Sequence, residues 1–459
     1  MFAKIYDTEI KTDYSNKDGF DCYPTDILTE YTQSYEEGLD IEKHKALFDD
    51  VSKMENGEIK SHMCDALFET IINADIRPDY KYNEPNDLEK IKELRKPYSF
   101  SAEKSDKETF KKKLLGAWTG RACGCLLGKP VEGIRSDEFI PFLKETGNYP
   151  MHRYILSTDV TDEVSSHYKF SFRNKPYGDV VDGMPVDDDT NYVVLAQKII
   201  EDSGRSFTSS DVAKAWLKYQ SVFSYFTAER VAYVNLIKCI EPPSSAMYKN
   251  PYREWIGAQI RGDYFGYINP GNPEKAAEMA FNDACISHVK NGIYGEMFVS
   301  AMISCAAVTD SIEDVIYGGL SEIPSTSRLY EKVVKIFDDY KNGVSLSEVF
   351  NYIHSEYDEH TSHGWCHVIS NAMIVVAALL YGEGDFGKSI CIAVEMAFDT
   401  DCNGATVGSI LGMRGGIDCI DDYWKKPVNG KIHTSIFGVD TVDIEKAVDK
   451  TLEHIESGD

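Results

Sequence analysis

Two short aspartate-rich segments are the clearest sign of chemistry in this sequence. The first reads Asp187-Asp188-Asp189-Thr190-Asn191 and begins an apolar pattern of helical periodicity. Adjacent carboxylates repel one another unless a cation lies between them. A single Asp suffices to cap a helix N-terminus, so a capping role leaves two of the three carboxylates unexplained. Taken alone, the segment is compatible with a metal site and with a helix cap.

The second segment, residues 399–404, reads Asp-Thr-Asp-Cys-Asn-Gly and precedes a helix of small residues. Its opening matches a calcium-binding EF-hand loop, but that loop requires Glu at its twelfth position, where this chain has Ile410. A phosphatase DxD motif needs a buried strand before Asp399, whereas the preceding residues have helical periodicity. The DDxxD motif of class I terpene cyclases also fails, because Asn191 and Tyr192 occupy the required positions.

The two segments lie about 210 residues apart, and each begins a helix that can pack closely. Two divalent ions would nearly neutralise their five aspartates, which are Asp187, Asp188, Asp189, Asp399 and Asp401. Oxygen ligands favour Mg²⁺, with Mn²⁺ or Ca²⁺ as alternatives, over zinc. Cys402 adjoins them, but its sulfur is a soft ligand for such ions. The pair of segments therefore predicts a dinuclear metal site.

A third segment places four glycines on one face of a helix: Gly116, Gly120, Gly124 and Gly128. Glycines four apart let another backbone approach closely, although they lower helix propensity. We interpret this face as structural. Glu132 follows the glycines, and a carboxylate at the end of a closely packed helix is a candidate general acid or base, with a surface role as the alternative.

The elements that must position these residues are almost all helices. Apolar residues recur at three- and four-residue intervals in seven segments, which are 108–128, 190–204, 210–226, 273–289, 296–308, 370–382 and 443–455. No internal repeat of roughly 20 to 50 residues is evident. We therefore predict an all-α fold in which residues 105–459 form an orthogonally packed multi-helix domain that holds the metal site.

Two stretches differ from this helical domain. Residues 1–104 are rich in polar side chains and contain helical patterns at 26–51 and 87–94, so we expect a helical N-terminal extension packed on the main domain. Residues 134–185 interrupt the helices and are interpreted as a long loop excursion that includes a short hairpin. Because this loop ends at the first aspartate segment, we expect it to form a wall or lid of the pocket.

Composition narrows the environment of the protein. The chain has 48 Lys and Arg against 75 Asp and Glu, a formal charge of -27 that disfavours binding to nucleic acids and to anionic membranes. Its eleven cysteines include no CxxC pair, which is typical of a reducing compartment. The N-terminus lacks the pattern of a signal peptide, and the most apolar stretch, 372–381, is too short to span a bilayer. We expect a cytoplasmic protein.

Three motifs follow one another along the chain: GRACGCLLGKPVEG, VDDDTN and FDTDCNGATVGSILG. Together they resemble the ADP-ribosylglycohydrolase family, which includes the dinitrogenase reductase-activating glycohydrolase. The likeness covers residues 110–413. It implies an all-α fold, a site for two Mg²⁺ ions, and hydrolysis of the bond that joins ADP-ribose to a protein side chain or a small acceptor.

The resemblance also implies roles for individual residues. It assigns metal-ligand positions to Asp187, Asp188, Asp189, Asp399, Asp401 and Cys402. Asp187 replaces a hydroxyl residue of the family pattern, Cys402 replaces Ser or Thr, and Phe398 replaces Gly. Glu132 falls where the family has an acidic residue implicated in catalysis. The segment with His288 and Tyr294 resembles the one that borders the adenosine and phosphate pocket.

These inferences predict a magnesium-dependent hydrolase whose partner is an ADP-ribosylated protein or a small ADP-ribosyl substrate. Two alternatives stay open. The chain could hydrolyse another N-riboside, such as a nucleoside, with Phe398 and Cys402 marking a changed pocket. It could also be a non-catalytic protein that binds metal or ADP-ribose, if Cys402 disables one metal position.

Overall fold

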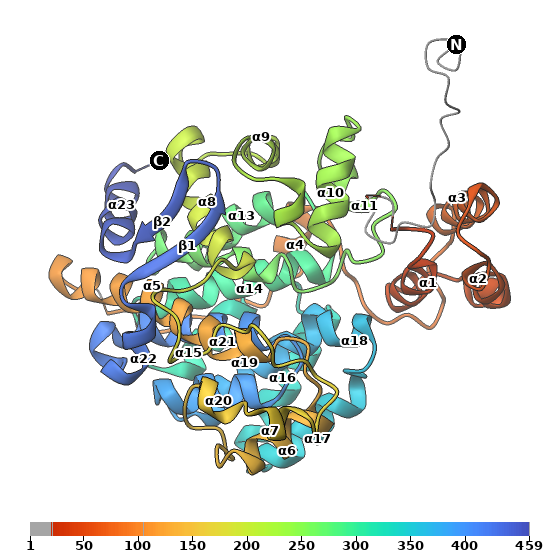
Figure 1. Ribbon diagram of the computed structural model, residues 1–459. Coiled ribbons are helices and arrows are strands. Elements are labelled where there is room, and N and C mark those ends of the chain that lie inside the picture. The colour runs from red at the N-terminus through yellow and green to blue at the C-terminus, as the bar shows by residue number, and fades with distance from the viewer. Residues whose placement is uncertain (1–19, 21, 104, 459) are drawn as a thin grey trace, which may run out of the picture.

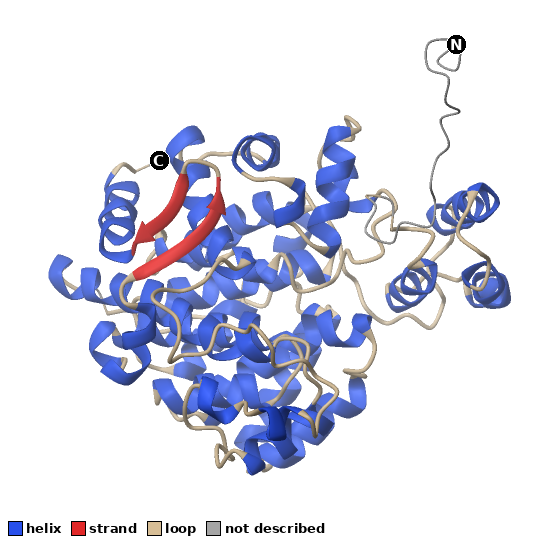
Figure 2. Cartoon of the chain, in the orientation of Figure 1, coloured by secondary structure: helices blue, strands red, loops and turns tan. Residues whose placement is uncertain are grey.

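The computed structural model describes residues 20, 22–103 and 105–458, and this part of the chain is almost entirely helical (Figures 1 and 2). The predicted all-α class is confirmed, and each of the seven segments with helical periodicity contains a helix. The first half comprises α1 (Ile27–Glu36), α2 (Lys45–Ser52), α3 (Glu58–Ile72), α4 (Leu88–Glu93), α5 (Lys107–Gly128), α6 (Ser136–Glu145), α7 (Asp162–Ser165), α8 (Asp188–Ser203), α9 (Ser209–Tyr219), α10 (Thr227–Ile237) and α11 (Ser244–Met247).

The second half of the chain continues the helical body and adds one hairpin. Its elements are α12 (Asp263–Tyr267), α13 (Pro273–Ala284), α14 (Asn291–Ala306), α15 (Ile312–Leu320), α16 (Arg328–Lys341), α17 (Leu346–Glu356), α18 (Ser362–Cys366), α19 (Val368–Tyr381), α20 (Phe386–Glu395), α21 (Thr400–Gly415), α22 (Asp422–Val428), β1 (Lys431–Ile436), β2 (Val439–Asp443) and α23 (Ile444–Glu456). Within the described residues, no helix is both long and apolar enough to cross a membrane.

Helices α5 and α21 run antiparallel through the core with their backbones in direct contact. The four glycines of α5 face Thr400, Gly404, Gly408 and Gly412 of α21. A Cβ atom added to Gly124 would overlap the carbonyl oxygen of Gly404, so no side chain fits there. This contact places the C-terminal end of α5, with Lys129 and Glu132 just beyond it, beside the N-terminal end of α21.

Two further helices complete the core around this pair. Every residue of α14 is buried, and α19 is buried except at its last residue. A helix that is covered on all sides has no need of a polar face, which accounts for the nearly continuous apolar sequence of α19. Both helices contact α21 and therefore support the glycine contact from behind.

The N-terminal helices α1, α2 and α3 form a small cluster on one side of the main body (Figure 1). The helical pattern at 26–51 is divided at Gly38, whose φ of +93° ends the first helix. The cluster joins the body through buried ion pairs: Arg253 lies 2.8 Å from Glu30 and 2.6 Å from Glu37. Further along the extension, Glu84 pairs with Arg328 at 2.9 Å.

The excursion at 134–185 differs from its prediction in two ways. It begins with the ten-residue helix α6, and no two segments of the stretch pair as strands, so the predicted hairpin is wrong. The aromatic residues that suggested strand alternation pack around Phe142 instead, with the ring of Phe172 stacked on it at 4.5 Å. The backbone amides of Lys169 and Phe170 donate to the carboxylate of Glu138, which occupies donors that a strand partner would need.

The hairpin of the described chain lies instead at β1 and β2, near the C-terminal end (Figure 2). It holds the start of α8 in place, because Asn191 donates to the hydroxyl of Ser435 at 2.9 Å and accepts from its backbone amide at 3.1 Å. The amide of Met184 donates to the carbonyl oxygen of Lys431 at 2.9 Å. The chain that enters the first aspartate segment is thereby fixed from both sides.

Candidate metal centre

The two aspartate segments meet at one buried site, formed by the N-terminal ends of α8 and α21. Ligand atoms of Asp189, Asp401 and Cys402 lie within 4.8 Å of one another. A second such set consists of Asp187, Asp189 and Cys125 of α5. Backbone N–H groups at a helix N-terminus favour negative charge, so two helix starts can hold several carboxylates together.

Asp187 caps the first helix of the site and also pairs with a basic side chain. One carboxylate oxygen accepts the backbone N–H of Asp189 at 2.9 Å and so caps α8. The other oxygen lies 2.7 Å from the ammonium of Lys129. Burial by itself would raise the pKa of Asp187, but Lys129 lowers it below its ordinary value, so this carboxylate stays ionised.

Lys129 lies within the site, although the sequence did not single it out. Its Nζ atom forms ion pairs with three carboxylates, at 2.7 Å to Asp187, 2.7 Å to Glu132 and 3.2 Å to Asp401. Burial would lower the pKa of this ammonium, but Asp401 and Asp187 raise it well above its usual range. Its position in the sequence could have identified it, because Lys129 is the one basic residue between the glycine face and Glu132.

Arg121 of α5 is a second cation that the sequence analysis missed. It is buried, and its guanidinium contacts Asp263 at 2.7 Å, the side chain of Asp189 at 3.3 Å and the backbone carbonyl oxygen of Asp189 at 2.8 Å. Because Arg121 holds one carboxylate oxygen of Asp189, the orientation of that side chain is fixed from the core side.

Three buried carboxylate oxygens in this site accept no hydrogen bond: Oδ2 of Asp187, Oδ2 of Asp189 and Oδ1 of Asp401. Oδ2 of Asp187 forms an ion pair with Lys129, which leaves those of Asp189 and Asp401 as the two unpartnered oxygens. Burial raises the pKa of both groups well above the ordinary Asp value, and other carboxylates of the site, first Asp187 for Asp189 and Glu132 for Asp401, raise it further. Unpartnered buried carboxylate oxygens are energetically costly, and a bound cation would satisfy them. Hard oxygen donors of this kind suit Mg²⁺ or Mn²⁺, so the residues fit the metal that the sequence predicted.

Asp399 and Asp188 lie at the same helix starts. Burial and the charge of Glu132 raise the pKa of Asp399 to about 6. Burial and the charge of Asp187 raise the pKa of Asp188 well above its ordinary value. Both carboxylates are therefore close enough to the other acidic residues of the site to be affected by their charge.

The chain reaches Asp399 through an unusual backbone. Ala397 and Phe398 have φ angles of +61° and +57°, in the left-handed region that favours glycine. Holding two consecutive non-glycine residues there requires support, and Phe398 is fully buried with its ring 4.8 Å from that of His354. A glycine at 398 would adopt this turn without strain, so Phe398 is an unfavourable residue for the backbone directly before the predicted ligand Asp399.

The remaining predicted residues lie in different surroundings. Glu132 reaches the aspartates through Lys129 and keeps 38% of its side chain exposed. His288 is buried, shares a hydrogen bond with Ser287 at 2.8 Å, and has its pKa lowered by burial. Tyr294 donates to the carbonyl oxygen of Pro85 in the extension. Among the described contacts, neither His288 nor Tyr294 touches the aspartates, and their role in substrate binding stays a prediction.

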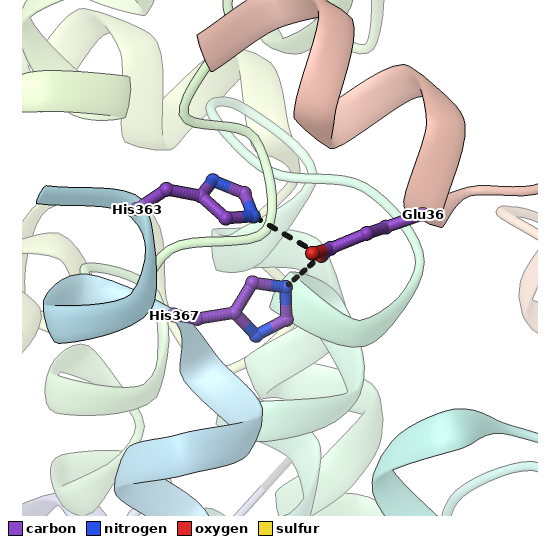
Figure 3. Close-up of side chains that lie close together, drawn as sticks. All are labelled: Glu36, His363 and His367. Carbon is purple, nitrogen blue, oxygen red and sulfur yellow. Dashed lines mark hydrogen bonds and ion pairs between the residues drawn. The ribbon is translucent and has the colours of Figure 1, made fainter. Parts of the chain in front are cut away.

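A second cluster of possible metal ligands consists of Glu36, His363 and His367 (Figure 3). Glu36 comes from α1 and lies 3.0 Å from Nε2 of His363 and 3.5 Å from Nε2 of His367. Sequence analysis missed it because Glu36 and His363 are 327 residues apart. Burial would raise the pKa of Glu36, but His363 and His367 lower it to about 2.

Hydrogen bonds to the opposite ring nitrogens argue against a metal in this second cluster. The indole N–H of Trp255 donates to Nδ1 of His363, and the backbone N–H of Ile369 donates to Nδ1 of His367, both at 3.1 Å. Each Nδ1 is therefore an acceptor, and each ring carries its proton on Nε2. A metal at Nε2 would displace that proton and leave the ring without any. The cluster instead ties α1 to the body through two histidines that face one ionised glutamate.

A cavity of about 730 Å³ lies beside this second cluster, between the N-terminal helices and the main body. Its walls include Glu36, Arg230, Tyr252, Trp255 and His363. The aspartates of the metal centre do not line it, although Cys366, two residues beyond Gly364 in its wall, is electrostatically coupled to Asp399 and Glu132.

Comparison with known proteins shows the family of the chain. The sequence model of the ADP-ribosylglycohydrolase family matches residues 106–458, so the chain belongs to this family, as its three motifs predicted. Among solved structures, one described as an ADP-ribosylglycohydrolase-related protein complex matches with 16% sequence identity and a TM-score of 0.44. The match covers 76% of this chain and 99% of that one. No curated protein sequence matches the chain.

Proposed function

We propose that this chain is a divalent-metal-dependent hydrolase that cleaves the glycosidic bond between ADP-ribose and a protein side chain or a small acceptor. Membership of the ADP-ribosylglycohydrolase family supports an ADP-ribosyl substrate. The observation that carries the metal dependence is the meeting of Asp189 and Asp401, from segments about 210 residues apart, each with a buried oxygen that lacks a donor. Such a pair is unfavourable without a cation.

Asp189 and Asp401 would hold the metal, with Asp188 and Asp399 at the same helix starts and Cys402 beside them. A bound Mg²⁺ or Mn²⁺ supplies Lewis acidity toward ribose hydroxyls and toward water. The protein contributes rigidity: Arg121 orients Asp189, and the glycine contact between α5 and α21 fixes the spacing of the two segments.

Glu132 is the carboxylate that we propose for proton transfer. It is the predicted catalytic residue, it is partly exposed, and Lys129 holds it 2.7 Å from the ammonium. Cleavage at C1 of ribose passes through an oxocarbenium-like transition state, which nearby carboxylates stabilise. Glu132 would take the proton of the attacking water or deliver one to the departing acceptor.

The test is an assay of the purified full chain on ADP-ribosyl-arginine, ADP-ribosyl-serine and simple nucleosides, each with Mg²⁺ or with EDTA. We expect release of ADP-ribose that requires the metal and that is lost in Asp189→Asn and Asp401→Asn. Asp422→Asn, at a fully exposed aspartate, is the matched control. Release from nucleosides alone would identify a different N-riboside hydrolase. Metal binding without release from any substrate would identify a binding protein.

A further inference from the structure

We infer that Lys129 permanently occupies one of the two cation positions of the aspartate site, so that the site binds a single divalent ion. The inference rests on the metal centre of the proposed function and departs from the two-ion site that the sequence predicted. The supporting observation is that some carboxylate oxygens of the site pair with the ammonium of Lys129, whereas others are buried without a donor.

Three carboxylates surround the ammonium of Lys129. It donates hydrogen bonds to Glu132 at 2.7 Å and to Asp401 at 3.2 Å, and it forms an ion pair with Asp187 at 2.7 Å. Asp187 belongs to the first aspartate segment and Asp401 to the second. Lys129 therefore bridges the two segments. Its ammonium lies where a metal ion would otherwise neutralise both.

Asp401 shows that a second cation position is left. Its Oδ2 atom pairs with Lys129, whereas its Oδ1 atom is buried without a donor. Asp189 is divided in the same way, because Arg121 holds Oδ1 and Oδ2 has no donor. These two aspartates, with Cys402, have ligand atoms within 4.8 Å of one another. One divalent ion placed there would complete the coordination of oxygens that Lys129 does not reach.

The backbone around Lys129 keeps the ammonium in place. Gly128 packs directly on Thr400, whose hydroxyl donates to the carbonyl oxygen of Gly128 at 3.0 Å. Pro130 follows, and its ring fixes its own backbone φ angle. Only 23% of the Lys129 side chain is exposed. A metal ion that displaced this ammonium would break three ion pairs and would leave a buried lysine without partners.

The experiment counts bound Mn²⁺ per chain and records its electron paramagnetic resonance spectrum, with the full-length protein. Wild type should bind one tight Mn²⁺ with the six-line signal of an isolated ion. Lys129→Met should bind two and show the signal of an exchange-coupled pair. Lys111→Met, at an exposed lysine on α5 that pairs with Asp449, should behave as wild type. The Asp401→Asn variant measures the weak surface binding expected of a chain with a charge of -27.

Two tight, coupled Mn²⁺ ions in wild type would overturn the inference, and so would a single ion in a folded Lys129→Met variant. If Lys129→Met does not fold, as judged by circular dichroism, the wild-type count decides alone, with one ion in favour and two against. No tight Mn²⁺ in wild type would overturn the metal centre itself, and with it the proposed function. Failure of the single-ion inference, by either of its two outcomes, is therefore distinguishable from failure of the proposed function.

Discussion

The hydroxyl of Thr400 donates to the carbonyl oxygen of Gly128 at 3.0 Å and joins the first residue of α21 to the last residue of α5. This bond lies between the ammonium of Lys129 and the carboxylate of Asp401, each one residue away. The two sides of the candidate metal centre are thus connected by this hydrogen bond as well as by the ion pair between Lys129 and Asp401.

Replacing Thr400 by Val keeps the shape of the side chain and removes this hydrogen bond. A buried carbonyl that loses its donor costs about 1 to 3 kcal/mol. We expect Thr400→Val to lose that much stability in urea denaturation and to bind Mn²⁺ more weakly, because Lys129 and Asp401 are no longer held in register. Thr400→Ser retains the hydroxyl and should stay close to wild type. Equal stability in both variants would show that the bond has no structural role.

The glycine contact gives a prediction about stability alone. Gly124→Ala places a methyl group on the carbonyl oxygen of Gly404, and backbone cannot move aside as a side chain can. Overpacking of this kind costs about 1 to 3 kcal/mol or more, so we expect a large fall in the urea midpoint. Gly57→Ala is the control, because its φ of 172° is ordinary extended backbone and a Cβ there meets no atom within 4 Å.

Metal binding should stabilise the folded protein. A ligand at 100 times its dissociation constant adds about 2.7 kcal/mol to the free energy of unfolding. We expect Mn²⁺ to raise the melting temperature of wild type, and EDTA to reverse the rise. The shift should vanish in Asp189→Asn, which removes charge from the position that Arg121 orients. A melting temperature that ignores Mn²⁺ at millimolar concentration would contradict the site.

Glu132→Gln separates catalysis from metal binding. An amide cannot accept a proton, and loss of a general acid or base lowers turnover by roughly 10²- to 10⁴-fold. We expect that loss with an unchanged count of bound Mn²⁺, because Glu132 contacts Lys129 and not the unpartnered oxygens. The comparison variant is Glu163→Gln, at an exposed residue of α7. Normal turnover in Glu132→Gln would remove Glu132 from the mechanism.

The cluster at Glu36 predicts how stability depends on pH. Burial lowers the pKa of His367 to about 3, whereas an unfolded histidine has a pKa of about 6.5. Below pH 6.5 the unfolded chain therefore binds a proton at His367 that the folded chain does not bind, and the free energy of unfolding falls as pH decreases below about 6.5. Between pH 7 and pH 5 this group alone removes about 2 kcal/mol.

His367→Gln tests this assignment, because it should flatten the pH dependence by that amount while other buried histidines keep theirs. Glu36 does not interfere in this window. Its pKa is lowered to about 2, so its own contribution is lost only as pH falls below the ordinary glutamate value of about 4.5. Identical pH profiles for wild type and His367→Gln, measured by urea denaturation, would refute a neutral buried His367.

Local pattern was sufficient to predict the helical class and several of the core helices. The helical periodicity of the seven segments located α5, α8, α14 and α19, and the glycine spacing indicated a close backbone contact. Residues 134–185 were misjudged because the alternation of Tyr168, Phe170 and Phe172 reflects an aromatic cluster rather than a strand. The real hairpin at β1 was missed because its inward residues include only two apolar side chains, Ile432 and Ile436.

The candidate site was predictable only in its acidic part. Closely spaced carboxylates repel one another and therefore indicate a bound cation, and the five aspartates were found on that basis. The two basic residues that pair with these aspartates were not predicted. Lys129 and Arg121 have no distinctive local pattern, and their partners Asp187 and Asp189 lie far away in the sequence. The partnership of Glu36 with His363 spans 327 residues, and no local pattern encodes it.

The contact between α5 and α21 has a consequence for the precision of the metal centre. Where side chains separate two helices, rotamer changes can alter the spacing by fractions of an ångström. Here no side chain lies between Gly124 and Gly404, so the spacing is a property of the main chain alone. The amide hydrogens of these two helices should be among the slowest in the protein to exchange with solvent. The two aspartate segments would then keep their mutual distance even while the surrounding side chains fluctuate.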